Sequence, residues 1–167
     1  MDELAGSGYA RLTMDRVARR AGVGKSAIYR RWPSKQDMIV EVLARLSIPA
    51  GPVPDTGSLR GDVRAMLQSV FDWLTDPRIR AVLPDLIAES DRNPVLAAAV
   101  AHHVTRPRLT WSRTALDRAC DRGELAADDI DLVQDLLIAP IFWRVTHTRP
   151  VDDQYLDRLT QLTTGGR

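Results

Sequence analysis

The chain has 167 residues, 44% apolar and 27% charged, so it has the composition of an ordinary globular protein and enough length to bury a core. It contains no run of about 20 apolar residues, as a membrane-spanning helix would need, and its acidic start is unlike a secretory signal. The net charge of +1 divides unevenly, because residues 1–47 hold nine Lys/Arg and five Asp/Glu, while residues 48–167 hold fourteen and seventeen. A basic N-terminal part is typical of a protein that meets a polyanion there.

Three or four short helices are predicted before residue 48, and bounds can be given for three of them. Thr13 is a suitable N-cap for the first, and Gly22 ends it in the way that glycine often ends helices. Ser34, with Asp37 three residues later, resembles a capping box that opens the third. The expected bounds are Met14–Ala21, Lys25–Trp32 and, for the third helix, Ser34 to about Ser47.

The segment Pro49–Gly57 contains three Pro and two Gly in nine residues, so no helix is expected to cross it. We therefore predict three parts: an N-terminal head over residues 1–47, a linker over 48–57, and a C-terminal body over 58–167.

Apolar residues recur at helical spacing throughout the body. The expected helices run from Leu59 to about Leu74, from Pro77 with a break or kink near Pro84, from Asn93-Pro94 to about Arg122 with an interruption at Pro107, from the Asp128 cluster to about Thr148, and after Asp152. No convincing alternating run of β-branched residues is present. The predicted fold is all-α, with an N-terminal three-helix head that contains a helix-turn-helix and a C-terminal helical bundle.

Residues 13–35 carry the strongest functional signal. Two short helices are joined by the tight turn Ala21-Gly22-Val23-Gly24, which is the pattern of a helix-turn-helix. The second helix of such a motif enters the major groove of DNA with its N-terminal residues toward the bases. Lys25, Ser26 and Arg30 are placed near base edges by this interpretation, and Tyr29 and Lys35 near phosphates.

In order and spacing, this stretch resembles the head of the TetR family of bacterial regulators. The matching pieces are Gly8-Tyr9, Thr13-Met14-Asp15, Val17-Ala18, Ala21-Gly22-Val23, Ile28-Tyr29-Arg30-Arg31-Trp32 and Ser34-Lys35. The resemblance implies a homodimeric repressor that a small-molecule effector releases from a palindromic DNA operator. The DNA-binding residues expected on both grounds are Thr13, Lys25, Ser26, Tyr29, Arg30, Arg31 and Lys35.

Three features depart from the family pattern. Gly24 stands where serine is common, Ala27 stands where a hydroxyl residue is usual, and only seven residues precede Gly8. The loss of the hydroxyl and the short first helix support one alternative, a helical protein-interaction module with a degenerate helix-turn-helix.

Two sets of body residues are candidates for further binding roles. A ligand pocket between helices is expected to be mostly apolar with a few polar groups. The candidate lining residues are Met66, Trp73, His102, Trp111, Phe142 and Trp143. The predicted helix after Asp128 is apolar on two sides and must be covered on both, which a second subunit can do. The candidate dimer contacts are Leu132, Leu136, Trp143, Tyr155 and Leu159.

Enzymatic and metal functions lack support. No Ser/His/Asp set, paired-carboxylate motif or phosphate-binding glycine loop is present, so an enzyme that uses Cys120 or the histidine pair is the weaker hypothesis. His102 and His103 are adjacent and point to different sides of a helix, which excludes a shared metal on one face. We expect no cofactor, no metal, no membrane contact and a cytoplasmic location, with which a single cysteine agrees.

Overall fold

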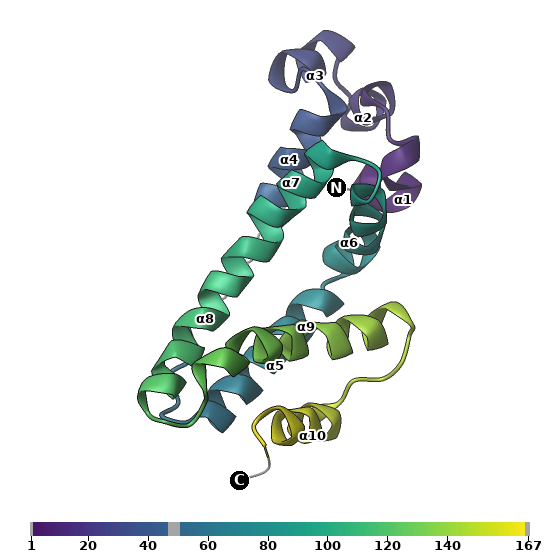
Figure 1. Ribbon diagram of the computed structural model, residues 1–167. Coiled ribbons are helices and arrows are strands. Elements are labelled where there is room, and N and C mark those ends of the chain that lie inside the picture. Colours follow the sequence, from purple (N-terminus) through teal and green to yellow (C-terminus); the bar gives the residue numbers. More distant parts are fainter. Residues whose placement is uncertain (1, 47–50, 166–167) are drawn as a thin grey trace. The chain divides into compact units, whose positions relative to one another are not determined.

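The computed structural model describes residues 2–46 and 51–165, and all regular secondary structure within these two ranges is helical (Figure 1). The helices are α1 (Asp2–Arg11), α2 (Met14–Ala21), α3 (Lys25–Arg31), α4 (Lys35–Leu46), α5 (Leu59–Thr75), α6 (Pro77–Ser90), α7 (Pro94–Val100), the π-helix η1 (Ala101–Thr105), α8 (Arg106–Asp121), the 3₁₀ turn η2 (Ala127–Asp129), α9 (Ile130–Thr146) and α10 (Asp153–Thr163). The predicted all-α class is confirmed. None of the described helices is long and apolar enough to cross a bilayer.

The predicted helix ends agree with the structure wherever a cap is present. The Thr13 hydroxyl accepts from the Arg16 amide at 3.3 Å, and Gly22 ends α2 with a φ of 67°. The Asp37 amide donates to the Ser34 hydroxyl at 3.1 Å, as the capping box requires. In the body, Asp152 accepts from the Tyr155 amide at 2.8 Å and begins α10.

The prolines of the body lie within helices or beside an irregular turn. Pro84 and Pro140 lie inside α6 and α9, so α6 is not broken at Pro84, and the interruption expected at Pro107 is present as the π-helix η1, which ends at Thr105. A proline ring crowds the carbonyl four residues earlier, and the wider π turn relieves this conflict. At the N-terminus, no bounds were predicted for the short first helix; α1 consists of two helical pieces that meet at Gly8, whose φ is 72°.

The chain forms two compact units, and each unit is built from two separate segments of the sequence. Unit 1 comprises residues up to 48 together with Pro77–Pro107, and unit 2 comprises Pro49–Asp76 and residues from 108 onward. Helices α6 and α7 therefore pack with the helices of the head. The domain boundary predicted at 48–57 stays a prediction, and its residues 48–50 lie outside the described residues.

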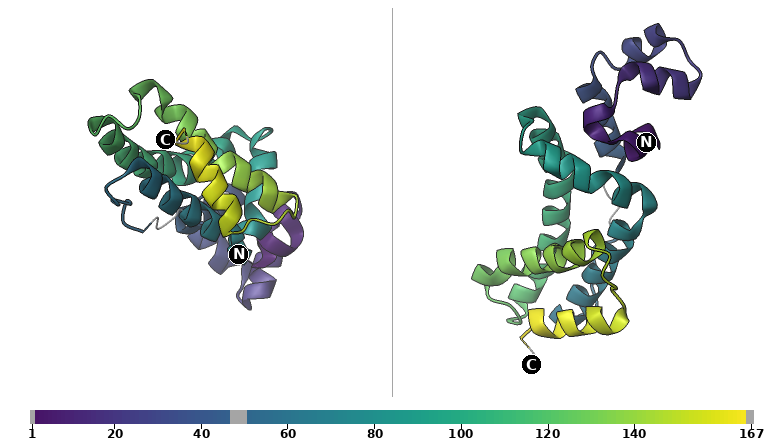
Figure 2. Two further views of the ribbon diagram at one scale, coloured as in Figure 1. Left: turned by 90° about the horizontal axis from the view of Figure 1, so that it is seen from below. Right: turned by 90° about the vertical axis from the view of Figure 1, so that its right-hand side faces the viewer.

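Each unit has its own apolar core. In unit 1, α1 packs against α6 and α4 packs against α7 and η1, with Ile39 and Leu43 fully buried. In unit 2, α5 lies beside both α9 and α10 (Figure 2), and Met66, Leu116 and Ile141 are fully buried. Unit 1 contains the helix-turn-helix and unit 2 contains the helix that we expect at a dimer interface.

Candidate nucleic-acid interface

The turn between α2 and α3 is closed by backbone hydrogen bonds. The Gly22 amide donates to the Arg19 carbonyl at 3.2 Å, and the Val23 amide donates to the Ala18 carbonyl at 3.1 Å. The positive φ of Gly22 makes this geometry possible at low cost. Because Ala18 and Ile28 are buried, α2 and α3 are held together by a small core.

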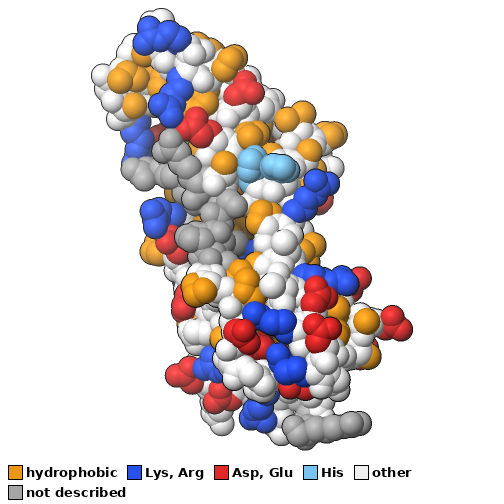
Figure 3. Space-filling model, turned by 90° about the vertical axis from the view of Figure 1, so that its left-hand side faces the viewer, with side chains coloured by type: hydrophobic (Ala, Val, Ile, Leu, Met, Phe, Trp, Pro, Cys, Tyr) orange, Lys and Arg blue, Asp and Glu red, His pale blue; other side chains and the backbone are white. Residues whose placement is uncertain are grey.

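One face of α3 is open to solvent. Lys25, Ser26, Tyr29 and Arg30 are all exposed, with Tyr29 48% exposed, whereas Ile28 on the other side is buried. The side chains of Ser26, Tyr29 and Arg30 make no hydrogen bond or ion pair within the part of the chain that the structure describes. Figure 3 shows basic side chains over the region of α3, at the top of that view. These three predicted DNA-binding residues are free to meet another molecule.

Lys25 is exposed but already paired. Its ammonium group forms an ion pair with the Asp15 carboxylate at the start of α2, and both side chains remain largely accessible. A DNA phosphate that binds Lys25 must therefore replace Asp15. Thr13, also a predicted DNA-binding residue, is exposed and uses its hydroxyl to cap α2.

Arg31 faces α4 rather than lying with the open face of α3. Its guanidinium pairs with Glu41 at 2.8 Å and lies 4.8 Å from the centre of the Trp32 ring. The Trp32 indole also donates to Glu41, at 2.6 Å. These interactions fix the end of α3 on α4, so Arg31 has a structural role in addition to its predicted one.

Lys35 is half-buried against Tyr9. Its ammonium donates to the Tyr9 carbonyl at 3.0 Å and lies 4.0 Å from the centre of the Tyr9 ring. The Tyr9 amide donates to Asp85 of α6 at 2.5 Å, and Asn93 donates to the Tyr9 hydroxyl at 3.2 Å. Burial raises the pKa of the Tyr9 phenol above its usual value. We call Tyr9, Lys35, Asp85 and Asn93 the Tyr9 clamp.

The Tyr9 clamp was not predicted as a unit. The pair Gly8-Tyr9 was noticed in the sequence, but no local pattern connects it with Asp85 or Asn93, which follow about 80 residues later. The positive φ of Gly8 exposes the Tyr9 amide to Asp85, and a glycine before an aromatic residue at the end of a helical segment was the available signal.

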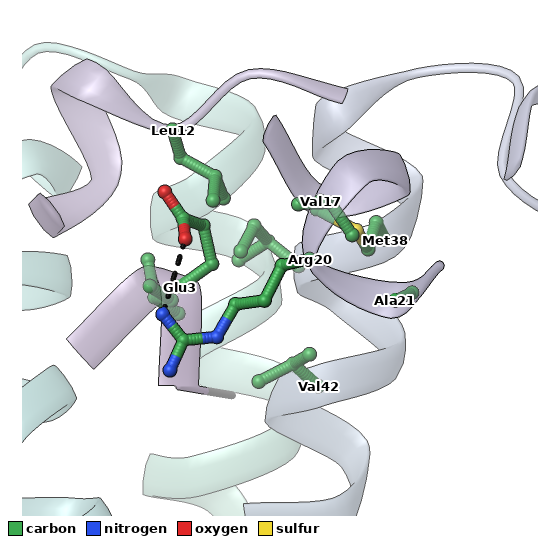
Figure 4. A pocket seen from close by; sticks show the side chains of 9 residues that line it. Glu3, Leu12, Val17, Arg20, Ala21, Met38 and Val42 are labelled. Atoms are coloured by element: carbon green, nitrogen blue, oxygen red, sulfur yellow. Dashed lines mark hydrogen bonds and ion pairs between the residues drawn. The ribbon is translucent and has the colours of Figure 1, made fainter. Parts of the chain in front are cut away.

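A hollow of about 250 Å³ lies among α1, α2 and α4 of unit 1. Figure 4 shows its apolar wall, which includes Leu12, Val17 and Val42, and the ion pair that joins Arg20 to Glu3 at 3.4 Å. None of the predicted DNA-binding or ligand-pocket residues lines this hollow.

The six candidate pocket residues do not share one environment. Met66 is fully buried in unit 2, and Trp73, Trp111 and Phe142 are half-buried there. Trp143 is 59% exposed and stacks on His147 at 3.8 Å between ring centres. His102 is exposed on the π-helix of unit 1. The pocket stays a prediction, and the Trp111 indole is engaged with the Gly51 carbonyl at 3.0 Å.

The candidate dimer residues divide into an open and a covered group. On α9, Leu132 is 58% exposed, Leu136 is half-buried and Trp143 is 59% exposed, while the opposite side of the helix packs against α5. Tyr155 is half-buried under the guanidinium of Arg144, which lies 3.9 Å from the centre of its ring. Leu159 is buried within unit 2, so it contributes to the core of a single chain.

Cys120 has no feature of an activated nucleophile. Burial and the nearby carboxylates of Asp117 and Asp121 raise the pKa of its thiol above the usual value, which lowers the thiolate fraction at neutral pH. Among the described residues, no three His, Cys, Asp or Glu side chains come together as metal ligands would.

Two family profiles match the chain: "Bacterial regulatory proteins, tetR family" over residues 1–42, and "Tetracyclin repressor-like, C-terminal domain" over residues 53–163. The chain is 36% identical over 157 residues to the DNA-binding transcriptional repressor TetR of Mycobacteroides abscessus, which covers 91% of this chain and 80% of the relative. It is 31% identical over 157 residues to the uncharacterized HTH-type transcriptional regulator YdeS of Bacillus subtilis, with 93% and 79% covered.

Solved structures give the same result. The TetR family transcription regulator SCO0332 superposes with a TM-score of 0.69 and 28% identity, over 99% of this chain and 92% of that one. Salmonella enterica GusR superposes with a TM-score of 0.73 and 20% identity, over 97% and 88% of the two chains, a likeness that shows the fold.

Proposed function

The chain belongs to the TetR family of DNA-binding transcriptional regulators, which are not enzymes, and from this premise we propose that it is a homodimeric repressor, released from a palindromic operator by a small-molecule effector. The observation that carries the proposal is the open face of α3, where Ser26, Tyr29 and Arg30 are exposed beside a closed helix-turn-helix. Because its target is chromosomal DNA, we place the protein in the cytoplasm.

The exposed apolar side of α9 supports the dimer. Leu132 and Trp143 lie three helical turns apart on one side of the helix and are each more than half exposed, while Leu162 of α10 is 68% exposed. Exposed large apolar side chains that share one side of a helix are typical of interaction surfaces. A two-fold dimer would carry two copies of α3, one for each half-site of a palindrome.

The Tyr9 clamp supports the response to an effector. It joins the end of α1 and the start of α4 to α6 and α7, all within unit 1. A displacement of α6 therefore pulls on the Tyr9 amide and on the helices that hold α3. An effector shifts the equilibrium only if it binds the DNA-incompetent arrangement more tightly, by about 1–3 kcal/mol in typical allosteric proteins.

The head assignment is tested with a double variant, Tyr29→Ala with Arg30→Ala. We expect it to bind DNA from upstream of its own gene at least tenfold more weakly, because both side chains lie on the open face of α3 that meets the duplex. The slope of log affinity against log salt should fall by about 0.9 for each phosphate that the variant no longer neutralises. The matched control is Arg80→Ala, which removes an exposed arginine from α6. Unchanged affinity in the double variant would refute the assignment.

The dimer is tested separately by sedimentation of Leu132→Glu. A charge at the centre of a buried apolar interface is costly, so the variant should sediment as a monomer where the unaltered protein is a dimer. Leu109→Glu is the control, since Leu109 is 43% exposed on α8. An unaltered dimer in Leu132→Glu would exclude this face of α9.

A further inference from the structure

Arg108 is an exceptional arginine of unit 2. It lies in the first turn of α8 and is half-buried, with its guanidinium carbon 4.2 Å from the centre of the Trp73 ring on α5. Its buried Nε has no hydrogen-bond partner, and its side chain forms no ion pair within the described parts of the chain. Burial lowers the pKa of the guanidinium to about 10, a sign of how poorly its charge is compensated.

Other partly buried arginines of the same unit are compensated. Arg64 pairs with Asp153 and Asp157, each at 2.7 Å, and Arg122 pairs with Glu124 at 2.9 Å and with buried Asp62 at 3.4 Å. Residues 47–50, which the structure does not describe, are Ser, Ile, Pro and Ala and bring no carboxylate. Because charges that are shielded from water are normally paired in folded proteins, a half-buried guanidinium without a carboxylate partner points to an anion from outside the chain.

The backbone that carries Arg108 is firmly held. The Ser112 hydroxyl donates to the Arg108 carbonyl at 3.0 Å, and Gln134 of α9 donates to Ser112 and to the Leu109 carbonyl, both at 2.7 Å. Ser112 and Gln134 are themselves buried. A guanidinium on a fixed backbone and over an indole ring is preorganised to bind two oxygens of one anionic group, which lowers the entropy cost of binding.

We propose that Arg108 and Trp73 form an anion-binding site for the effector, and that the effector is an organic anion with a carboxylate, sulfonate or phosphate group on an apolar body. This inference rests on the proposed function, since it names the chemical class of its ligand. Arg108 donates from its terminal nitrogens to the anionic group, and the Trp73 ring holds the guanidinium in place. Gln134 connects this site to α9, whose opposite side is the proposed dimer face.

The test compares two fluorescent probes that differ in one group. 8-Anilinonaphthalene-1-sulfonate carries an anionic sulfonate, and N-phenyl-1-naphthylamine has the same rings without it. We expect the full-length protein to bind the sulfonate at least tenfold more tightly. Arg108→Met should lose most of this preference and still bind the neutral probe, and Arg108→Lys should retain part of it because it keeps the charge without the planar fork.

The matched control is Arg106→Met, which removes an exposed arginine from the same turn of α8 and should leave both affinities unchanged. Equal binding of the two probes by the unaltered protein, or an unchanged preference in folded Arg108→Met and Arg108→Lys proteins, overturns the inference. DNA release is measured in parallel by fluorescence anisotropy. If the sulfonate binds through Arg108 but the protein never binds DNA, the proposed function fails and the anion site stands.

Discussion

The ion pair between Asp15 and Lys25 gives a prediction about DNA affinity: Asp15→Asn should make the protein bind DNA more tightly. Lys25 begins α3, and in the free protein its charge is directed at Asp15. In the complex, a phosphate must compete with that carboxylate, and the carboxylate itself repels the DNA. Replacing it with a neutral side chain of equal size removes both effects.

The size of the effect follows from the exposure of the pair. The side chains of Lys25 and Asp15 are 65% and 44% exposed, so breaking the pair costs about 0.2–1 kcal/mol. Removing that cost corresponds to about 1.4- to 5-fold tighter binding. Lys25 then neutralises one phosphate without first losing a partner, so the slope of log affinity against log salt should steepen by up to about 0.9. Asp15 also lies in the first turn of α2, where a negative charge favours the helix by about 0.3–1 kcal/mol. The variant should therefore bind more tightly although it is slightly less stable.

The assay is fluorescence anisotropy on a short mixed-sequence duplex over a series of salt concentrations, which does not require the operator to be known. Asp37→Asn is the matched control, because it removes the same charge from an exposed residue that contacts the Ser34 hydroxyl and not a lysine. In a Lys25→Ala background, Asp15→Asn should retain only the smaller gain from removing a charge that repels the DNA, because the ion pair is already gone. If Asp15→Asn and Asp37→Asn tighten binding equally, or if the full gain persists without Lys25, the pair has no special role and the reasoning is wrong.

Three other variants test the remaining interactions. Gly8→Ala should lower the free energy of unfolding by about 1–2 kcal/mol in a urea titration, because alanine is strained at a φ of 72° and its Cβ would meet Asp85 at 3.3 Å. Unchanged stability would contradict the left-handed backbone conformation of Gly8 at the break in α1. Arg108→Leu should raise the unfolding free energy of the ligand-free protein by about 1–3 kcal/mol. An apolar replacement removes the desolvation cost of a half-buried, unpaired charge and gives up only one cation–π interaction. A clear decrease in stability would show that the charge of the guanidinium is balanced within the folded protein. Arg122 and the Leu59 amide lower the pKa of Glu124, so its carboxylate stabilises the fold above the pKa of the unfolded chain and stops doing so as the pH falls through the lower folded value. The melting temperatures of the unaltered protein and Glu124→Gln should accordingly differ at neutral pH and converge once the pH lies below the lowered pKa of Glu124, and a difference that persists in stronger acid would exclude this cause.

Most of the helices could be predicted because their ends are determined locally. Thr13, Gly22, Ser34 and Asp152 use their own side chain or backbone within a few residues, and this information is present in a short window of sequence. The break in α1 could not be predicted in the same way. It is stabilised by Asp85, which is brought to the Tyr9 amide only when α6 packs on α1.

The candidate site shows the same division. The sequence identified the residues of α3 that are exposed, since the motif itself places Lys25, Ser26, Tyr29 and Arg30 on one side of a short helix. It did not identify which lysines and arginines already form ion pairs within the protein. Whether a lysine meets a phosphate or a neighbouring carboxylate depends on distances between helices, and these are properties of packing.

The cations that are already paired within the protein bear on how a DNA-binding regulator finds its site. The +4 charge of residues 1–47 suggests strong attraction to any DNA, yet Lys25 pairs with Asp15, Arg31 with Glu41, and Arg16 and Arg20 with Glu3. Each of these pairs must be exchanged before its cation can contribute to binding, which reduces the sequence-independent part of the affinity. Arg30 needs no such exchange, because it lies exposed on the recognition face of α3 without a carboxylate partner among the described residues. Weaker attachment to random sequence, together with the base contact predicted for Arg30, would raise the ratio of specific to non-specific binding, and that ratio decides how fully a specific site is occupied among many competing sites.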